Sequence, residues 1–161
     1  MPRESQQPSA TRCEPRPNKG AKCRILLVED NPADVYMLRE ALGVGPDGDI
    51  DLVTLGDGEE ALDYIMRSGP FAEAPTPDLV VLDLNLPKLD GIDILRRLRP
   101  LEAYRDVPVV VFTSSDSPRD RANALASGAT EFLTKPSELD LFLQIGRRLR
   151  TYLPSGRDGQ C

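Results

Sequence analysis

The sequence predicts an α/β fold in which helices cover both faces of one parallel β-sheet. Short apolar runs alternate with amphipathic segments five times along the chain, which is the pattern of repeated β-α units. Several runs are apolar at consecutive positions, as strands buried on both faces are. The chain has 5% aromatic residues and no Trp, which favours an aliphatic core of this kind. Because crossovers are right-handed, five strands and five helices favour the flavodoxin-like, doubly wound strand order 2-1-3-4-5.

The first two β-α units are expected between residues 23 and 68. The run CRILLVE (23–29) predicts the first strand. In the segment that follows (34–42), apolar residues recur at helical spacing, at Val35, Leu38 and Leu42. The run IDLVTL (50–55) predicts the second strand, and GEEALDYIMRS (58–68) predicts a helix that buries Ala61, Leu62, Ile65 and Met66.

The remaining segments continue the alternation of strand and helix. In chain order they are DLVVLDL (78–84), GIDILRRLR (91–99), VPVVVFT (107–113), SPRDRANALASG (117–128), TEFLT (130–134) and ELDLFLQIGRRLRTYL (138–153). The last of these helices carries one apolar face, which is typical of a helix packed on a sheet and consists of Phe142, Ile145, Leu149 and Tyr152.

The two ends of the chain differ from this pattern. Residues 1–22 are rich in Pro, Arg, Ser and Gln and poor in apolar residues, which predicts a disordered arm. We therefore expect one domain over residues 23–153 and a flexible tail at 154–161. The three cysteines, Cys13, Cys23 and Cys161, form no CxxC motif, and we interpret them as reduced thiols of a cytoplasmic protein.

Charge and composition exclude several classes of function. The net charge is −6 and the pI about 4.8, so we expect no nucleic acid and no membrane surface as partner. No segment has the pattern of a signal peptide or the length of a membrane span. His is absent, which excludes imidazole bases, His metal ligands and a phosphohistidine formed on this chain. Any chemistry must use carboxylates, amines and hydroxyls.

Polar side chains follow the predicted strands. Glu29 and Asp30 come at the end of the first strand, Asp83 at the third, Thr113 at the fourth and Lys135 after the fifth. Doubly wound sheets bind ligands at this edge, outside the carboxyl ends of their strands. Clustered carboxylates repel unless a cation joins them, and a few hard oxygen ligands suit Mg²⁺. Asp83 is therefore a candidate nucleophile toward phosphorus, with Lys135 and Thr113 stabilising the phosphoryl oxygens.

These residues lie in motifs that resemble the receiver domains of two-component response regulators. The motifs are LLVEDNPAD, VVLDLNLPKLDG, VVVFTSS and GATEFLTKP, and the resemblance covers about residues 23–152. It implies that Asp83 accepts a phosphoryl group. It also implies one Mg²⁺ and no organic cofactor, with the cation held directly by Asp30, Asp83 and the backbone carbonyl of Asn85, and through water by Glu29.

The same resemblance implies a switch that follows phosphorylation. Thr113 would move toward the phosphoryl group, Lys135 would contact it, and the ring of Phe132 would change rotamer. Phe132 stands where many receivers have tyrosine, so a plain role in the core is an equal alternative. Receivers also imply a cis peptide bond between Lys135 and Pro136.

Several loops are similar to those of small stand-alone regulators paired with bacterial phytochromes, among them VEDNPADVYMLREAL and RSGPFAEAPTPD. This similarity implies a sensor histidine kinase as partner, with a phytochrome as candidate, and a homodimer. We expect self-phosphorylation from phosphodonors with Mg²⁺ and self-dephosphorylation, but no enzyme activity on other substrates. Signalling would use changed protein contacts. The predicted dimer or partner face is Leu139, Phe142, Leu143 and Arg147.

Three other functions were weighed. A phosphotransferase of the haloacid dehalogenase type needs a second acid two residues after its nucleophile, where this chain has Asn85. A flavodoxin needs a loop that cradles phosphate, and VEDNPAD would repel one. The alternative left open is a receiver-like interaction module that works without phosphorylation, although the complete set of polar residues at the strand ends argues against it.

Overall fold

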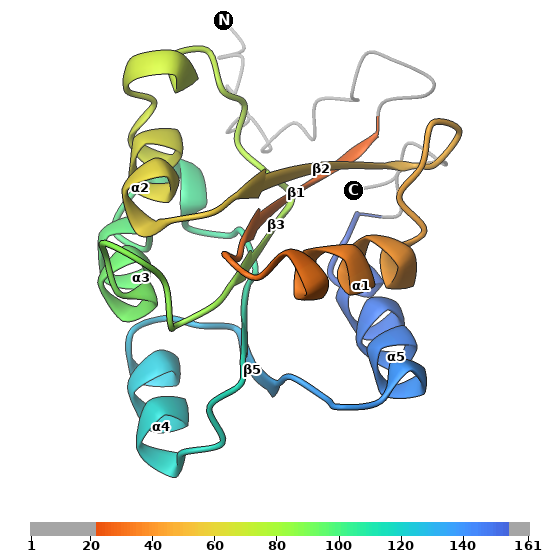
Figure 1. Ribbon diagram of the computed structural model, residues 1–161. Helices are drawn as coiled ribbons and strands as arrows, with labels where there is room; N and C mark the ends of the chain where they lie inside the picture. The colour runs from red at the N-terminus through yellow and green to blue at the C-terminus, as the bar shows by residue number, and fades with distance from the viewer. Residues whose placement is uncertain (1–21, 155–161) are drawn as a thin grey trace, which may run out of the picture.

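The computed structural model describes residues 22–154, which form a five-stranded parallel sheet between two layers of helices (Figure 1). The strands are β1 (Cys23–Val28), β2 (Ile50–Leu55), β3 (Leu79–Leu82), β4 (Val109–Thr113) and β5 (Glu131–Thr134). Their order in the sheet is β2-β1-β3-β4-β5, and every neighbouring pair is parallel. The predicted fold class and strand order are confirmed.

Helices cover the two faces of the sheet unequally. α1 (Pro32–Leu42) and α5 (Leu139–Arg150) lie side by side on one face, and α2 (Gly58–Met66), α3 (Gly91–Leu98) and α4 (Pro118–Ala126) lie on the other (Figure 1). Two short 3₁₀ helices that the sequence did not predict lie in connections, η1 (Gly69–Phe71) and η2 (Glu102–Tyr104). The five predicted helices are confirmed, with ends that are shorter or longer by one to three residues.

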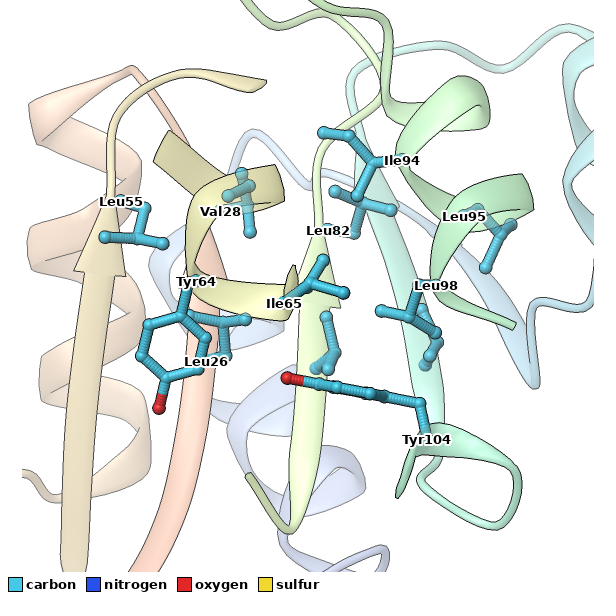
Figure 2. Packing of buried hydrophobic residues seen from close by; sticks show 13 residues of the cluster. Leu26, Val28, Leu55, Tyr64, Ile65, Leu82, Ile94, Leu95, Leu98 and Tyr104 are labelled. Carbon is cyan, nitrogen blue, oxygen red and sulfur yellow. The ribbon is translucent and has the colours of Figure 1, made fainter. Parts of the chain in front are cut away.

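The apolar runs of the strands supply two cores at once. Along β1, Leu26 and Val28 face α2 and α3, whereas Ile25 and Leu27 face α1 and α5. Figure 2 shows the first of these cores, in which side chains of β1 and β3 meet those of α2 and α3. Successive side chains of a strand point to opposite faces, so a strand covered on both sides must be apolar at every position.

The buried face of α2 differs from the prediction at two of the four predicted positions. Ala61 and Ile65 are buried as predicted, together with Tyr64, whereas Leu62 is half-buried and Met66 is 55% exposed. Met66 follows Ala61 by five residues, which at 3.6 residues per turn carries it off the face that contacts the sheet. Tyr64 takes its place in the core and donates a hydrogen bond from its hydroxyl to the carbonyl of Pro75 at 2.9 Å.

The prediction that Phe142 belongs to a partner face is wrong. Its side chain is 5% exposed and packs edge-on against Phe112 of β4, with ring centroids 5.8 Å apart. It lies on the stripe of α5 that faces the sheet, so no partner can reach it. Leu139 and Leu143 of the same predicted face are exposed, and so is Arg147.

The predicted arm at 1–22 and tail at 154–161 fall outside the described residues, except for Lys22 and Pro154 at their inner ends. Cys13 and Cys161 also lie outside. Cys23 lies in β1, and its thiol donates to the carbonyl of Pro154 at 3.7 Å. Within residues 22–154, no helix combines the length and the apolar character that crossing a membrane requires.

Candidate functional site

The register of the sheet brings two buried carboxylates together. Val28 pairs with Leu82, and the backbone N–H of Asp83 donates to the carbonyl of Val28 at 3.0 Å. Glu29 and Asp83 therefore each lie one residue beyond a pair of aligned strand ends, and their side chains are buried. Asp30 is exposed, but its carboxylate lies with theirs, because ligand oxygens of all three residues are within 4.8 Å of one another.

Lys135 follows β5, a strand at the edge of the sheet, and its side chain reaches this cluster. Its backbone N–H donates to the carbonyl of Thr113 at 2.7 Å, which fixes the start of its side chain beside the end of β4. Its Nζ donates hydrogen bonds to Oδ2 of Asp34 at 2.8 Å and Oδ2 of Asp83 at 3.0 Å. It also forms an ion pair with Oε2 of Glu29 at 2.7 Å.

Asp34 was not among the predicted site residues. Asp34 is the first residue of the segment predicted to be helical (34–42), and acidic residues are common in the first turn of a helix because they interact favourably with the helix dipole. α1 starts at the rim of the sheet, beside the end of β1, and this position turns an ordinary first-turn acid toward the cluster. The available signal was the short distance in sequence between Asp34 and Glu29 at the strand end.

Burial and charge shift the titration of two of these groups. Burial raises the pKa of Glu29 most, and the carboxylate of Asp83 raises it as well, whereas contacts with Lys135 and the backbone of Asn31 lower it; the net pKa is about 7. Burial also lowers the pKa of Lys135, but the carboxylates of Asp34, Glu29 and Asp83 outweigh this effect and the net pKa is raised. Lys135 is therefore a cation among carboxylates.

The cluster fits a divalent cation on structural grounds. Oε2 of Glu29 is buried and accepts no hydrogen bond, since its contact with Lys135 does not have hydrogen-bond geometry. Three carboxylates that converge at this distance supply the hard oxygen ligands that Mg²⁺ prefers. Asn85 donates its backbone N–H to Oδ1 of Asp83 at 3.2 Å, and its own carbonyl as a metal ligand stays a prediction.

Thr113 and Phe132 lie on the next two strands. Thr113 is buried at the end of β4, and its hydroxyl oxygen accepts a hydrogen bond from the backbone N–H of Ser115 at 3.4 Å. Phe132 of β5 is buried in a small cluster with Val111 and Ala124, and the guanidinium of Arg121 lies 6.0 Å from its ring centroid. Phe132 is thus a core residue in this structure, and its change of rotamer stays a prediction.

The expectation of a cis bond before Pro136 is wrong. All peptide bonds of the described residues are trans, including the one between Lys135 and Pro136. An X–Pro bond keeps a preference for trans of about 0.5–1 kcal/mol unless the surrounding structure overrides it. The trans bond still allows the contacts of Lys135 with Asp34 and Asp83.

Comparison with known proteins identifies relatives of the whole described domain. A family model described as the response regulator receiver domain matches residues 25–146. The chain is 36% identical over 122 residues to response regulator Rcp1 of Synechocystis sp., which covers 75% of this chain and 82% of Rcp1. It is 37% identical over 134 residues to the transcriptional regulatory protein TrcR of Mycobacterium tuberculosis. This match covers 83% of the chain but 46% of TrcR, so the chain spans less than half the length of that relative.

Two solved structures extend the comparison. The structure of the phosphorylated cyanobacterial phytochrome response regulator RcpA superposes with a TM-score of 0.77 at 35% identity, covering 84% of this chain and all of RcpA. The Mn²⁺-bound form of Rcp1 superposes with a TM-score of 0.74 at 31% identity, covering 83% of this chain and 99% of that one.

Proposed function

The chain belongs to the response regulator receiver domain family, and from this premise we propose that it accepts a phosphoryl group on Asp83 from a sensor histidine kinase. Receiver domains are phosphoacceptors rather than classical enzymes. The observation that carries the proposal is the environment of Asp83, a buried carboxylate 3.0 Å from the ammonium of Lys135 and beside two further acids. A buried acid in a cluster of this kind indicates a reactive site rather than a structural one.

In the proposed transfer, a carboxylate oxygen of Asp83 attacks the phosphorus of a phosphohistidine on the kinase. A P–O bond forms, the P–N bond breaks, and the imidazole leaves with the electron pair and takes up a proton. Nζ of Lys135 already lies within hydrogen-bond distance of Oδ2 of Asp83. After the transfer it would donate to a phosphoryl oxygen instead of to Oδ2. We further propose self-phosphorylation from small phosphodonors and hydrolysis of the resulting acyl phosphate.

Receiver domains bind Mg²⁺ or Mn²⁺ at an acidic pocket, and we propose that Glu29, Asp30, Asp83 and the carbonyl of Asn85 hold Mg²⁺ here. Support comes from the convergence of the three carboxylates and from the buried, unbonded Oε2 of Glu29. When bound, the cation would offset the negative charge that the phosphoryl group brings. Without it, the carboxylates would repel an anionic phosphodonor, which predicts that the transfer requires the metal.

The proposed output is a change on the surface formed by α4, β5 and α5. Thr113 would turn its hydroxyl toward the phosphoryl group and give up the hydrogen bond from Ser115. Ser115 is linked to α4 because its hydroxyl donates to Asp120 at 2.5 Å. Movement of Thr113 would therefore alter the start of α4 and the space around Phe132, which packs against α4.

A phytochrome is our candidate for the kinase. The support is the similarity to RcpA, whose published structure is that of a phytochrome response regulator. The similarity extends over 84% of the chain at 35% identity, which is enough to share a fold and a site but not to fix a partner. Rates of phosphotransfer from a panel of purified kinases that includes phytochromes would test this candidate, and a faster transfer from an unrelated kinase would contradict it.

A second copy of the chain is the partner that we propose for α5. Leu139 and Leu143, which we call the α5 leucine patch, lie one turn apart on the same side of α5 and are 56% and 38% exposed; Leu141 is 40% exposed but lies on another side of the helix. Neighbouring exposed leucines on one side of a helix are typical of a surface that another protein covers. Arg147 lies one turn farther along the same helix and is also exposed.

The dimer is tested by the molar mass in solution at micromolar concentration, with and without phosphorylation. We expect a dimer for the wild type and a monomer after Leu139→Ser with Leu143→Ser. Met66→Ser removes an equally exposed apolar side chain from α2, and it should leave the dimer intact. A wild-type monomer in both states would overturn the proposal.

The central test of the proposed function is the intact mass after incubation with acetyl phosphate. We expect one phosphoryl group on the wild type with Mg²⁺, and none with a chelator or after Asp83→Asn. Asp93→Asn removes an exposed carboxylate from the first turn of α3 and serves as the matched control. A folded wild type that gains no group, with loss during the measurement excluded, would favour an interaction module that works without phosphorylation.

A further inference from the structure

The side chain of Lys135 must span a large part of the sheet edge to reach Asp83. β5 lies two strand positions from β3, and neighbouring strands are about 4.8 Å apart. A lysine side chain has four rotatable bonds and many rotamers, so it holds an extended form only where its ammonium has fixed partners. The exposed fraction of the Lys135 side chain is 10%, and its partners are three carboxylates, two just beyond the ends of β1 and β3 and one in the first turn of α1.

Two of these partners change during the proposed reaction. Asp83 becomes an acyl phosphate, and its oxygen then no longer serves as a free carboxylate. Glu29 belongs to the proposed metal site, and its contact with Lys135 is an ion pair without hydrogen-bond geometry. Asp34 neither reacts nor belongs to that site, and its hydrogen bond to Lys135 at 2.8 Å is the shorter of the two that the ammonium donates.

We propose that Asp34 is a positioning residue that anchors the ammonium of Lys135 beside Asp83 before and after phosphorylation. Through this anchor it keeps a proton donor at the place where a phosphoryl oxygen arrives. The inference rests on the proposed function of Asp83. With Asp34, the first turn of α1 takes part in the site together with the strand ends.

A purely structural role for Asp34 in its own helix does not account for its conformation. Asp34 stands three residues after the N-cap Asn31, the position from which an acid can bond back to the N-cap backbone N–H. That N–H instead donates to Oε1 of Glu29 at 3.0 Å, and the cap of α1 is formed by the side chain of Asn31, which accepts from Ala33 at 2.9 Å. The carboxylate of Asp34 extends to Lys135 instead.

The experiment compares two substitutions that remove the same charge. Asp34→Ala removes the negative charge and the acceptor, whereas Asp34→Asn removes the charge and keeps an amide oxygen that can accept from Lys135. Asp93→Ala is the control, because Asp93 also lies in the first turn of its helix, α3, and is exposed. The rate of phosphorylation by acetyl phosphate is measured with saturating Mg²⁺, after circular dichroism has shown that each variant is folded.

We expect Asp34→Ala to lower this rate about tenfold, since a misplacement of about 1 Å in a reacting site can cost up to about 100-fold. Asp34→Asn should stay within about twofold of the wild type, and Asp93→Ala should match it. In a Lys135→Ala background, Asp34→Ala should have no further effect, because Asp34 acts through Lys135.

A second readout follows Lys135 directly. The chain has four lysines, so selective ¹⁵N labelling of lysine gives few side-chain signals to assign. The ammonium signal of Lys135 should be protected from exchange with water in the wild type and in Asp34→Asn, and lost in Asp34→Ala.

Several results would overturn the proposal. Equal rates for Asp34→Ala and wild type would do so, and so would equal slowing by Asp34→Ala and Asp34→Asn, which would indicate a general effect of charge. An undiminished effect of Asp34→Ala in the Lys135→Ala background would show that Asp34 acts elsewhere. Each of these leaves phosphorylation of Asp83 intact. A wild type that accepts no phosphoryl group would instead overturn the proposed function and this inference together.

Discussion

The side chain of Arg99 joins three segments through their backbone carbonyls. Its guanidinium donates to the carbonyl of Gly128 at 2.8 Å, of Tyr104 at 2.8 Å and of Val107 at 3.0 Å. These carbonyls belong to η2, the loop before β4 and the turn before β5. Burial lowers the pKa of Arg99, although the charge of Asp106 acts in the opposite direction.

We predict that Arg99→Ala lowers the free energy of unfolding by about 2–3 kcal/mol, because it leaves part-buried carbonyls without donors. Arg99→Lys should recover little of this lost stability. The planar guanidinium fork reaches carbonyls in three segments at once, and a single ammonium cannot. Urea denaturation measures both effects. Arg97→Ala removes an exposed guanidinium from the same helix and should change the stability by less than about 0.5 kcal/mol. Equal losses for the two alanine variants would contradict the prediction.

The contacts of Glu131 in β5 should make the free energy of unfolding depend on pH. It forms an ion pair with Arg148 at 2.8 Å and accepts a short hydrogen bond from the hydroxyl of Tyr152. Burial raises the pKa of Glu131, but the hydrogen bonds with Arg148 and Tyr152 lower it by more, so the net pKa lies below its ordinary value. Because the pKa of Glu131 is lower in the folded state than in the unfolded state, its charge stabilises the fold at pH values above the unfolded-state pKa. This stabilisation is lost as the pH falls through the folded-state pKa.

Glu131→Gln should therefore cost about 1 kcal/mol at pH 7, and the difference from wild type should begin to shrink below the ordinary glutamate pKa of about 4.3 and vanish only below the lowered pKa of the folded state. The free energy of unfolding, measured by denaturant at several pH values, gives the comparison. Glu73→Gln, an exposed site in a loop, should follow the wild type throughout. A difference that is constant with pH would mean that the glutamate charge does not contribute.

Among the elements, α1 and α5 pack unusually closely because of one glycine. A Cβ on Gly146 would lie 2.4 Å from the carbonyl oxygen of Ala41 and 2.8 Å from its Cβ. Replacing glycine by alanine inside a helix favours the helix by about 1 kcal/mol. Here, however, the new methyl group would meet the backbone carbonyl of Ala41, which cannot move without moving α1. Crowding in a close-packed interface costs about 1–3 kcal/mol.

We therefore predict that Gly146→Ala destabilises the chain by about 1–2 kcal/mol, against its gain in helix propensity. Thermal or urea unfolding gives the value. Gly45→Ala is the control, since a Cβ there would meet nothing within 4 Å. If Gly146→Ala stabilised the protein, the two helices would have to separate at little cost, and this account of their contact would be wrong.

The same helices show which parts of the structure the sequence could predict. Continuous apolar runs predicted all five strands and helical spacing of apolar residues predicted the helices, because burial leaves these patterns in the sequence. The rule of right-handed crossovers then gave the sheet order. These patterns could not predict the contact between Asp34 and Lys135, which are 101 residues apart and meet through tertiary structure alone. They also failed for Met66, where a position near the end of a helix turned away from the sheet.

At the site, the residue types at the strand ends predicted that the carboxylates and Lys135 lie together. They did not predict which of these side chains contact one another. The resemblance to receivers supplied roles that spacing alone could not, and it supplied one error, the cis bond before Pro136. Peptide isomers depend on the packing around one bond, which leaves no pattern in a single sequence. Gly91, the first residue of α3, leaves no room for a side chain, since a Cβ there would lie 2.4 Å from the carbonyl oxygen of Asp83.

Across the whole molecule, the source of stability and the site of chemistry are separate. Both cores lie along the length of the sheet, and their residues are nearly all buried. The carboxylates gather at one edge, where Glu29, Asp34 and Asp83 contact the ammonium of Lys135 and Asp30 lies beside Glu29 and Asp83. The net charge of −6 adds to their repulsion. The edge therefore opposes folding, and the cores must compensate for it.

This arrangement predicts that Mg²⁺ stabilises the fold. A ligand that binds only the folded state adds RT ln(1 + [L]/Kd), which is about 2.7 kcal/mol at 100 times Kd. The unfolding midpoint should rise with Mg²⁺ concentration and fall again with a chelator. Asp30→Asn should remove most of this rise, because it takes away an exposed carboxylate that the proposed site needs.

In the absence of metal, Asp30→Asn should have the opposite effect and raise the stability by up to about 1 kcal/mol, since it removes one of the repelling charges. The sign thus reverses between the two conditions for the same variant, which a general effect on folding cannot produce. Asp93→Asn, an exposed carboxylate on α3, should show neither the gain nor the loss. An Asp30→Asn variant with an undiminished response to Mg²⁺ would place the cation away from these carboxylates and would remove the electrostatic basis of the proposed transfer.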